Sequence, residues 1–231
     1  YEKDLINKPV KSKIDKVVRK RTKLNLYISL NILCVFIAYF VSLRAVLFFS
    51  VYIFLIWFYS HKLKRSLVVG NIVSSVLSVI PFLIILIYYK NFESIIFMYA
   101  MFLFLIVYVR ELIKDLENIK GDFTLNYKTL PVVYGEKTSK YIITLCILLN
   151  VVVIYFLLTY FDTGNMYYYY YFSIFLLTIF VYVLWKFNNK KYYNFLHNLL
   201  KFIIVLGVLS IVLIDLDLFL DKFYLLLNYF M

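Results

Sequence analysis

Long apolar runs constrain this chain more than any other feature of its sequence. Seven stretches are suited to crossing a lipid bilayer, where a helix needs about 20 predominantly apolar residues. They are 24–43, 45–60, 66–89, 92–113, 139–161, 166–186 and 197–220. Each run is continuously apolar rather than alternating, which favours helices over the strands of a closed barrel. The sequence therefore predicts an all-α, polytopic membrane helix bundle with seven transmembrane helices, the first two forming a tight hairpin.

The basic residues alternate with these spans. The chain has 25 Lys and Arg against 13 Asp and Glu, a balance that in a soluble protein would suggest a nucleic-acid partner. Here 22 of the 25 lie before the first span or in every second connection, and only Arg44, Lys90 and Lys222 lie on the other side. Positively charged segments stay in the cytoplasm. The charge therefore reports topology, and no nucleic-acid partner is expected. It divides the chain into a cytoplasmic basic segment, 1–23, and a transmembrane domain, 24–231.

Polar residues gather in three patches on the predicted cytoplasmic side: DLINKP from Asp4, YSHKLKR from Tyr59, and RELIKDLENIKGD from Arg110 with KTLP shortly after it. In a helix that continues past residue 113, Asp115, Asn118 and Asp122 share one face. Carboxylate and amide oxygens suit Mg²⁺, which one or two carboxylates and substrate phosphates usually hold. On spacing alone, a solvated helix end with i,i+4 ion pairs explains the same pattern.

The three patches, in this order and on one membrane face, resemble the motifs of the UbiA superfamily of intramembrane prenyltransferases. The third patch is similar to D-x-x-x-D followed by K-T-L-P-V-x-x-G, the second to Y-S-x-x-L-K-R-x-x-x-x-G-N, and the first to the end of N-D-x-x-D-x-x-x-D-x-x-N-K-P. The chain departs from the pattern at Asn118, where the family has an Asp, and at Lys11-Ser12, where it has Arg-Pro. The chain is accordingly identified as an N-terminally truncated member, whose seven spans match helices 3–9 of the family's nine-helix fold.

The resemblance implies a reaction and a role for each patch. An isoprenyl group would pass from a prenyl diphosphate to a lipid or aromatic acceptor within the membrane. The implied ligands of Mg²⁺ are Asp4, Asp115, Asn118 and Asp122. The implied catalytic residues are Asp115, Asn118, Asp122 and Tyr59. The implied contacts to the diphosphate are Lys64, Arg65, Arg110, Lys128, Asn7 and Lys8.

The acceptor is the open point of this interpretation. The third patch looks most like family members that act on geranylgeranylglycerol phosphate, and next most like those that act on 4-hydroxybenzoate or dihydroxynaphthoate. A transporter is a more distant alternative, because it would need charged residues at mid-membrane depth or paired broken helices. A CDP-alcohol phosphotransferase is not supported, since the chain has no Asp-Gly pair.

Composition and the remaining reactive residues complete the prediction. Frequent Lys, Asn, Ile and Tyr are typical of an AT-rich genome, so a bacterial inner membrane is expected, with the site loops in the cytoplasm. Cys34 and Cys146 lie in apolar runs and are interpreted as inert buried thiols. His61 and His197 are interpreted as residues at helix edges rather than ligands.

Overall fold

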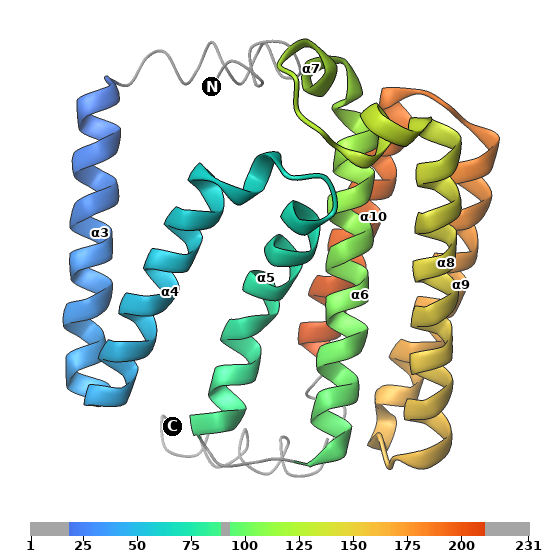
Figure 1. Cartoon of the computed structure of the whole chain (residues 1–231). Coiled ribbons are helices and arrows are strands. Elements are labelled where there is room, and N and C mark those ends of the chain that lie inside the picture. The colour runs from blue at the N-terminus through green and yellow to red at the C-terminus, as the bar shows by residue number, and fades with distance from the viewer. Residues whose placement is uncertain (1–18, 89–92, 211–231) are drawn as a thin grey trace, which may run out of the picture.

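The chain folds into a bundle of long helices (Figure 1), and the computed structural model describes residues 19–88 and 93–210. In chain order the elements are α3 (Lys20–Val41), α4 (Leu43–His61), η1 (Leu63–Arg65), α5 (Val69–Tyr88), α6 (Ser94–Glu117), α7 (Ile119–Thr124), α8 (Leu130–Tyr160), η2 (Gly164–Met166), α9 (Tyr167–Lys186) and α10 (Lys190–Ser210). Six of these helices are long and apolar enough to cross a membrane, and Val69–Ile84 within α5 adds a shorter apolar helix. The predicted all-α membrane bundle is confirmed.

Each of the seven predicted spans corresponds to one long helix. The boundaries move most in the fifth and seventh spans, where α8 begins at Leu130 rather than residue 139 and α10 at Lys190 rather than residue 197. Helix α10 begins with the polar residues Lys190 and Lys191, and in α8 the polar residues 136–140 separate the first turn from the long apolar run, so a search for continuous apolar sequence leaves both beginnings out. The match of these helices to helices 3–9 of a nine-helix fold stays a prediction.

Helix α6 is the axis of the bundle. It packs against α5, α8 and α10, and its buried side chains extend along most of its length. Ile106, Leu112 and Ile113 are among the most deeply buried side chains of the core. A helix that is apolar on most sides and surrounded by other helices needs no lipid-facing surface. Helix α6 therefore fixes the positions of the polar residues at its C-terminal end.

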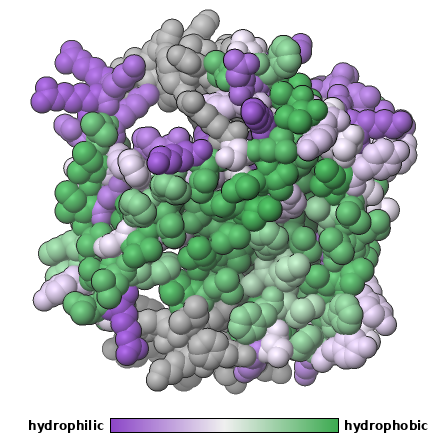
Figure 2. Space-filling model, in the orientation of Figure 1, coloured by the Kyte–Doolittle hydropathy of each residue, from purple (hydrophilic) through white to green (hydrophobic). Residues whose placement is uncertain are grey.

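Helices α3 and α4 form a hairpin that packs mostly against itself. The turn between them is a single residue, Ser42, whose Oγ accepts a hydrogen bond from the backbone N–H of Ala45 at 3.1 Å and so caps α4. This confirms the predicted tight hairpin. Most of its large apolar side chains are exposed in the structure, as lipid-facing side chains are. Figure 2 shows the broad hydrophobic band across the bundle, with hydrophilic side chains toward its two ends.

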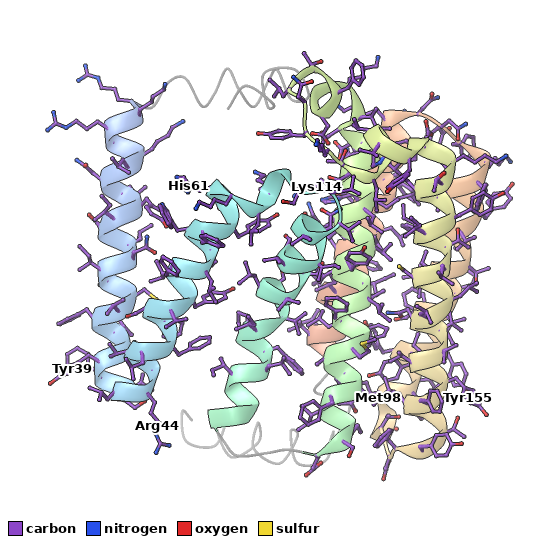
Figure 3. The ribbon with its side chains drawn as sticks, in the orientation of Figure 1. Tyr39, Arg44, His61, Met98, Lys114 and Tyr155 are labelled. Carbon is purple, nitrogen blue, oxygen red and sulfur yellow. The ribbon has the colours of Figure 1, made fainter. Side chains whose placement is uncertain are left out.

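The connections that carry the basic residues all lie at one end of the bundle, which we call the polar end. It comprises residues 59–66, 110–140 and 186–191 (Figure 1). Arg44 lies at the opposite end, in the turn region of the α3–α4 hairpin (Figure 3). The alternation of charge along the sequence therefore places these connections on the same side.

Glycine and proline residues determine the backbone conformation at the polar end. Pro131 lies in the first turn of α8, and Gly135 has a φ of 85°, which divides a short first turn from the rest of that helix. Glycine adopts this conformation without the strain that a side chain would impose. At Gly70, a Cβ atom would lie 2.9 Å from the carbonyl oxygen of Leu63. Only glycine therefore lets the start of α5 approach η1 this closely.

Candidate functional site

A buried hydrogen bond joins the second and third patches. The side-chain amide of Asn71, in the first turn of α5, donates from Nδ2 to Oδ2 of Asp115 on α6 at 2.7 Å. Both side chains are buried. The Oγ of Ser75 donates to the carbonyl oxygen of Asn71 at 2.8 Å, which ties the same turn to the rest of α5. Residues 44 positions apart thus meet at the polar end, and Asp115 is held in one orientation.

The third patch bends where α6 meets α7. Helix α6 continues past the predicted boundary at residue 113 to Glu117 and then breaks at Asn118. Nδ2 of Asn118 donates to the carbonyl oxygen of Lys114 at 2.7 Å. The backbone N–H of Asp122 donates to the carbonyl oxygen of Asn118 at 3.0 Å, as the first backbone bond of α7. Asn118 therefore ends the helix that carries Asp115 and begins the one that carries Asp122.

Asp122 is the most deeply buried carboxylate in the described part of the chain. Its exposed fraction is 0%, against 8% for Asp115 and 4% for Asn118. A carboxylate is costly to bury unless cations or hydrogen-bond donors surround it. The position of Asp122 therefore points to compensating positive charge at this place in the fold.

One turn below these residues, Glu111 holds two cations of α6. Its Oε1 lies 3.3 Å from Nη1 of Arg110, and its Oε2 lies 2.8 Å from Nζ of Lys114. Figure 3 shows Lys114 at the polar end of α6. Tyr59, in the last turn of α4, is half-buried and lies within electrostatic range of Glu111, Lys114 and Asp115. The structure thus brings Tyr59 close to Glu111, Lys114 and Asp115, while Arg110 is paired with Glu111.

The other predicted phosphate contacts lie on connections at the polar end. Lys64 and Arg65 belong to η1, and the side chain of Lys64 is exposed. Lys128 is exposed in the segment between α7 and α8. The predictions for Asp4, Asn7 and Lys8 fall on residues outside those that the structure describes.

Sequence reasoning missed one residue of this region and placed one wrongly. Asn71 is the Asn of the G-N pair that ends the second motif, but the sequence predicts no role for it. The prediction that His197 lies at a helix edge is wrong, because α10 begins seven residues before it and buries its side chain to an exposed fraction of 8%. The polar residues that open α10 hid this from a search for apolar runs. His61 is exposed, and its Nδ1 lies 3.0 Å from the carbonyl oxygen of Trp57 in its own helix, so that interpretation is confirmed.

The donor set at this site fits magnesium. Within residues 19–88 and 93–210, no group of three or more His, Cys, Asp or Glu side chains could hold a metal ion by itself. Magnesium needs fewer, because it keeps several waters and takes further oxygens from phosphates. Two buried carboxylates and an amide, from Asp115, Asp122 and Asn118, supply the hard oxygen ligands that this ion prefers.

Comparison with known proteins gives a family and a set of relatives. The UbiA prenyltransferase family matches residues 1–196 of the chain. A digeranylgeranylglyceryl phosphate synthase of Pyrococcus furiosus is 31% identical over 152 residues, which are 66% of this chain and 54% of the relative. The synthase of that name from Thermococcus sibiricus is 32% identical over 142 residues, 62% of this chain and 50% of the relative. The one from Methanosphaera stadtmanae is 27% identical over 152 residues, 66% and 54% of the two chains.

These matches cover only part of each relative. The chain spans about half the length of the curated relatives that it matches. No solved structure gives a significant match.

Proposed function

Because the chain belongs to the UbiA prenyltransferase family, we propose that it transfers an isoprenyl group from a prenyl diphosphate to a lipid acceptor inside the membrane. We further propose geranylgeranylglycerol phosphate as the acceptor. The names of the three relatives support this choice over 4-hydroxybenzoate or dihydroxynaphthoate.

The observation that carries this proposal is the pairing of buried carboxylates with cations at one end of an apolar bundle. Asp115 is oriented by Asn71, Asp122 is fully buried, and Arg110 and Lys114 lie one turn or so away. A substrate with a diphosphate head and a hydrocarbon tail needs both parts of this arrangement. Its head binds at the polar end and its tail lies in the apolar interior.

Magnesium would be held by Asp115 and Asp122, with the amide oxygen of Asn118 and with Asp4 as further ligands. When bound, it neutralises the charge that develops on the departing diphosphate. Members of this family are generally Mg²⁺-dependent. Asn118 brings no charge, so the two carboxylates provide most of the attraction in this part of the site.

The residues of the chain position the two substrates and stabilise charge. Lys64, Arg65 and Lys128 would bind oxygens of the diphosphate through charge-assisted hydrogen bonds, and Asn7 and Lys8 would do so from the first patch. The bond from the prenyl carbon to the diphosphate breaks, the hydroxyl oxygen of the acceptor bonds to that carbon, and the hydroxyl proton passes to the departing diphosphate. The ring of Tyr59 would stabilise the developing allylic cation through its π face. Fixed charges act more strongly in a water-poor bundle than in water.

The protein is an integral membrane protein, and we propose that its polar end faces the cytoplasm. The support is the 22 to 3 division of its basic residues, because positive segments stay on the cytoplasmic side. A bacterial inner membrane stays a prediction from composition, and the relatives found are archaeal.

A transfer assay in membranes tests the function. Cells expressing the protein supply the membranes, which receive radiolabelled geranylgeranyl diphosphate and Mg²⁺. Geranylgeranylglycerol phosphate, 4-hydroxybenzoate and dihydroxynaphthoate are offered separately. We expect label to enter the glycerol-phosphate lipid only, and EDTA to abolish its entry. Label in an aromatic product would replace the proposed acceptor, and no label in any product from a folded protein would refute prenyl transfer.

Asn71→Ala is predicted to lower the affinity of the site for Mg²⁺, so that transfer needs a higher Mg²⁺ concentration. The substitution removes the donor that lies 2.7 Å from Oδ2 of Asp115, so the carboxylate is no longer held in one orientation. Loss of a residue that orients a metal ligand lowers metal affinity about 10- to 100-fold. The Mg²⁺ concentration for half-maximal transfer should rise by about that factor, and Asn71→Gln should recover part of it. An unchanged Mg²⁺ titration would contradict the assignment of Asp115 as a ligand.

A further inference from the structure

A second polar group lies on the α10 side of α6. It consists of Arg110, Glu111 and Lys114 from α6 and of His197 and Lys201 from α10, and we call it the α6–α10 basic cluster. Helices α6 and α10 pack directly against each other. The four charged members are the groups close enough to act electrostatically on His197. Three positive charges against one negative charge leave the cluster with an excess of two positive charges.

Two buried nitrogen atoms of this cluster have no hydrogen-bond partner in the described part of the chain. They are Nδ1 of His197 and Nε of Arg110. The side chain of His197 is only 8% exposed. Buried polar atoms of folded proteins are nearly always paired, so the two unpaired atoms of this cluster need an explanation. An anionic acceptor between α6 and α10 would satisfy both.

A phosphate group has the charge and the oxygens that this cluster requires. The guanidinium of arginine presents a planar set of donors that matches phosphate oxygens. Glu111 holds Arg110 and Lys114 side by side through contacts of 3.3 Å and 2.8 Å. The two cations are thereby kept near the buried histidine, and charge-assisted hydrogen bonds to a phosphate are stronger than bonds between neutral groups.

Arg110 is offset from Asp115 on α6. It precedes Asp115 by five residues, which corresponds to about 7.5 Å along the helix axis and to about 140° around it. Asp115 lies on the side of α6 that contacts α5, and Arg110 lies within electrostatic range of His197 on α10. Glu111 and Lys114 lie between the two, within electrostatic range of both Tyr59 and His197.

We propose that the α6–α10 basic cluster binds the phosphate of the acceptor lipid, while the carboxylates serve the diphosphate of the donor. This rests on the proposed function, and it moves Arg110 from the donor, where the resemblance placed it, to the acceptor. A prenylglycerol phosphate carries its phosphate and its free hydroxyl on the same three-carbon glycerol. With the phosphate at the cluster, we expect the hydroxyl to face the donor, because Glu111 and Lys114 belong to the surroundings of both His197 and Tyr59. The cluster therefore selects phosphate lipids over aromatic acids, whose single carboxylate has less charge.

Binding in the absence of metal tests the site directly. The unfolding midpoint of the purified protein is measured in detergent with EDTA, with geranylgeranylglycerol phosphate or with the same lipid lacking its phosphate. We expect the phosphate lipid alone to raise the midpoint, and we expect His197→Phe to abolish that rise. Equal stabilisation by the dephosphorylated lipid, or stabilisation that requires Mg²⁺, would overturn the proposal. If His197→Phe does not fold, the two lipids are compared on the unsubstituted protein, and a rise in the unfolding midpoint with the phosphate lipid alone supports the proposal.

Steady-state kinetics separate the acceptor from the donor. Arg110→Met and His197→Phe should raise the KM for the acceptor about tenfold or more, with the KM for the donor within about twofold. His197→Asn keeps an N–H group near the position of Nδ1 and should recover most of the loss. The matched control is His61→Phe, because His61 is exposed and contacts Trp57 of its own helix. It should change neither KM.

The remaining outcomes each have one meaning. A raised donor KM would assign the cluster to the diphosphate, and unchanged KM values with a lowered unfolding midpoint would assign it to packing. Both results overturn the proposal. Binding of the phosphate lipid through His197 without transfer to any acceptor would refute the proposed function and support the subsite. Prenyl transfer that neither Arg110→Met nor His197→Phe changes would support the proposed function and refute the subsite.

Discussion

Asp122→Asn is expected to lower the rate of prenyl transfer by about 10³-fold while the protein stays folded. The substitution keeps the size and the buried position of the side chain but removes the negative charge from a fully buried place next to Asn118. Asn118 is already neutral, so only Asp115 would remain charged among the three site residues of this patch. Transfer is measured with radiolabelled donor at saturating Mg²⁺, and the unfolding midpoint is measured on the same preparations.

The matched control for this substitution lies at the other end of the bundle. Oδ1 of Asp162 accepts a hydrogen bond from the backbone N–H of Gly164 at 3.0 Å, and an asparagine there retains the accepting oxygen. Asp162→Asn should leave transfer unchanged. A rate for Asp122→Asn within about tenfold of the unsubstituted protein would remove Asp122 from the chemistry.

Lys140→Met should give the largest loss of stability among single substitutions at the polar end. Nζ of Lys140 donates to the carbonyl oxygens of Leu184 at 2.6 Å and Phe187 at 3.2 Å, and to the side chain of Asn188. The lysine is only 4% exposed. It therefore satisfies the last carbonyls of α9, which have no partner within that helix.

Methionine keeps the length of this side chain but leaves those buried acceptors without a donor. Removing one member of such a buried charged group costs roughly 3 kcal/mol, which corresponds to a fall in the unfolding midpoint of roughly 5–10 °C. Thermal unfolding in detergent measures the shift. Lys137→Met is the control, because Lys137 is exposed on the same helix, and its midpoint should stay within about 1 °C. Equal midpoints for the two variants would show that the buried amine does not hold α9.

The sequence predicted the parts of this fold that depend on local pattern. The apolar runs identified seven helices, and the alternation of basic residues placed their connections at one end. The order of three motifs predicted that Tyr59 and Asp115 lie on one membrane face, and the structure adds the bond between Asn71 and Asp115, which are 44 residues apart. The positions of Pro131 and Gly135 are also explained by the local backbone. Pro131 lies in the first turn of α8, and Gly135 divides that turn from the rest of the helix.

The parts that were missed depend on packing between distant segments. Nothing in the local sequence of His197 separates a buried histidine from one at a helix edge, and its burial follows from the contact of α10 with α6. The same holds for Lys140, whose partners lie 44 to 48 residues further along the chain. Hydropathy also places a helix boundary where polarity begins, whereas α8 includes the polar residues 136–140 and α10 begins with the exposed Lys190 and Lys191.

Helix α6 combines two properties that many proteins keep on separate elements, since it is the centre of the packing and also carries Arg110, Glu111, Lys114 and Asp115 of the site. A substitution that tightens its apolar contacts also changes the angle at which Glu111 and Asp115 are presented. Selection on thermal stability and selection on catalysis therefore act on the same 24 residues. Such coupling limits how freely either trait evolves, because stabilising changes near a functional site commonly reduce activity. In directed evolution, gains in robustness for this protein should accumulate on α3, α4 and α9, while α6 stays nearly invariant.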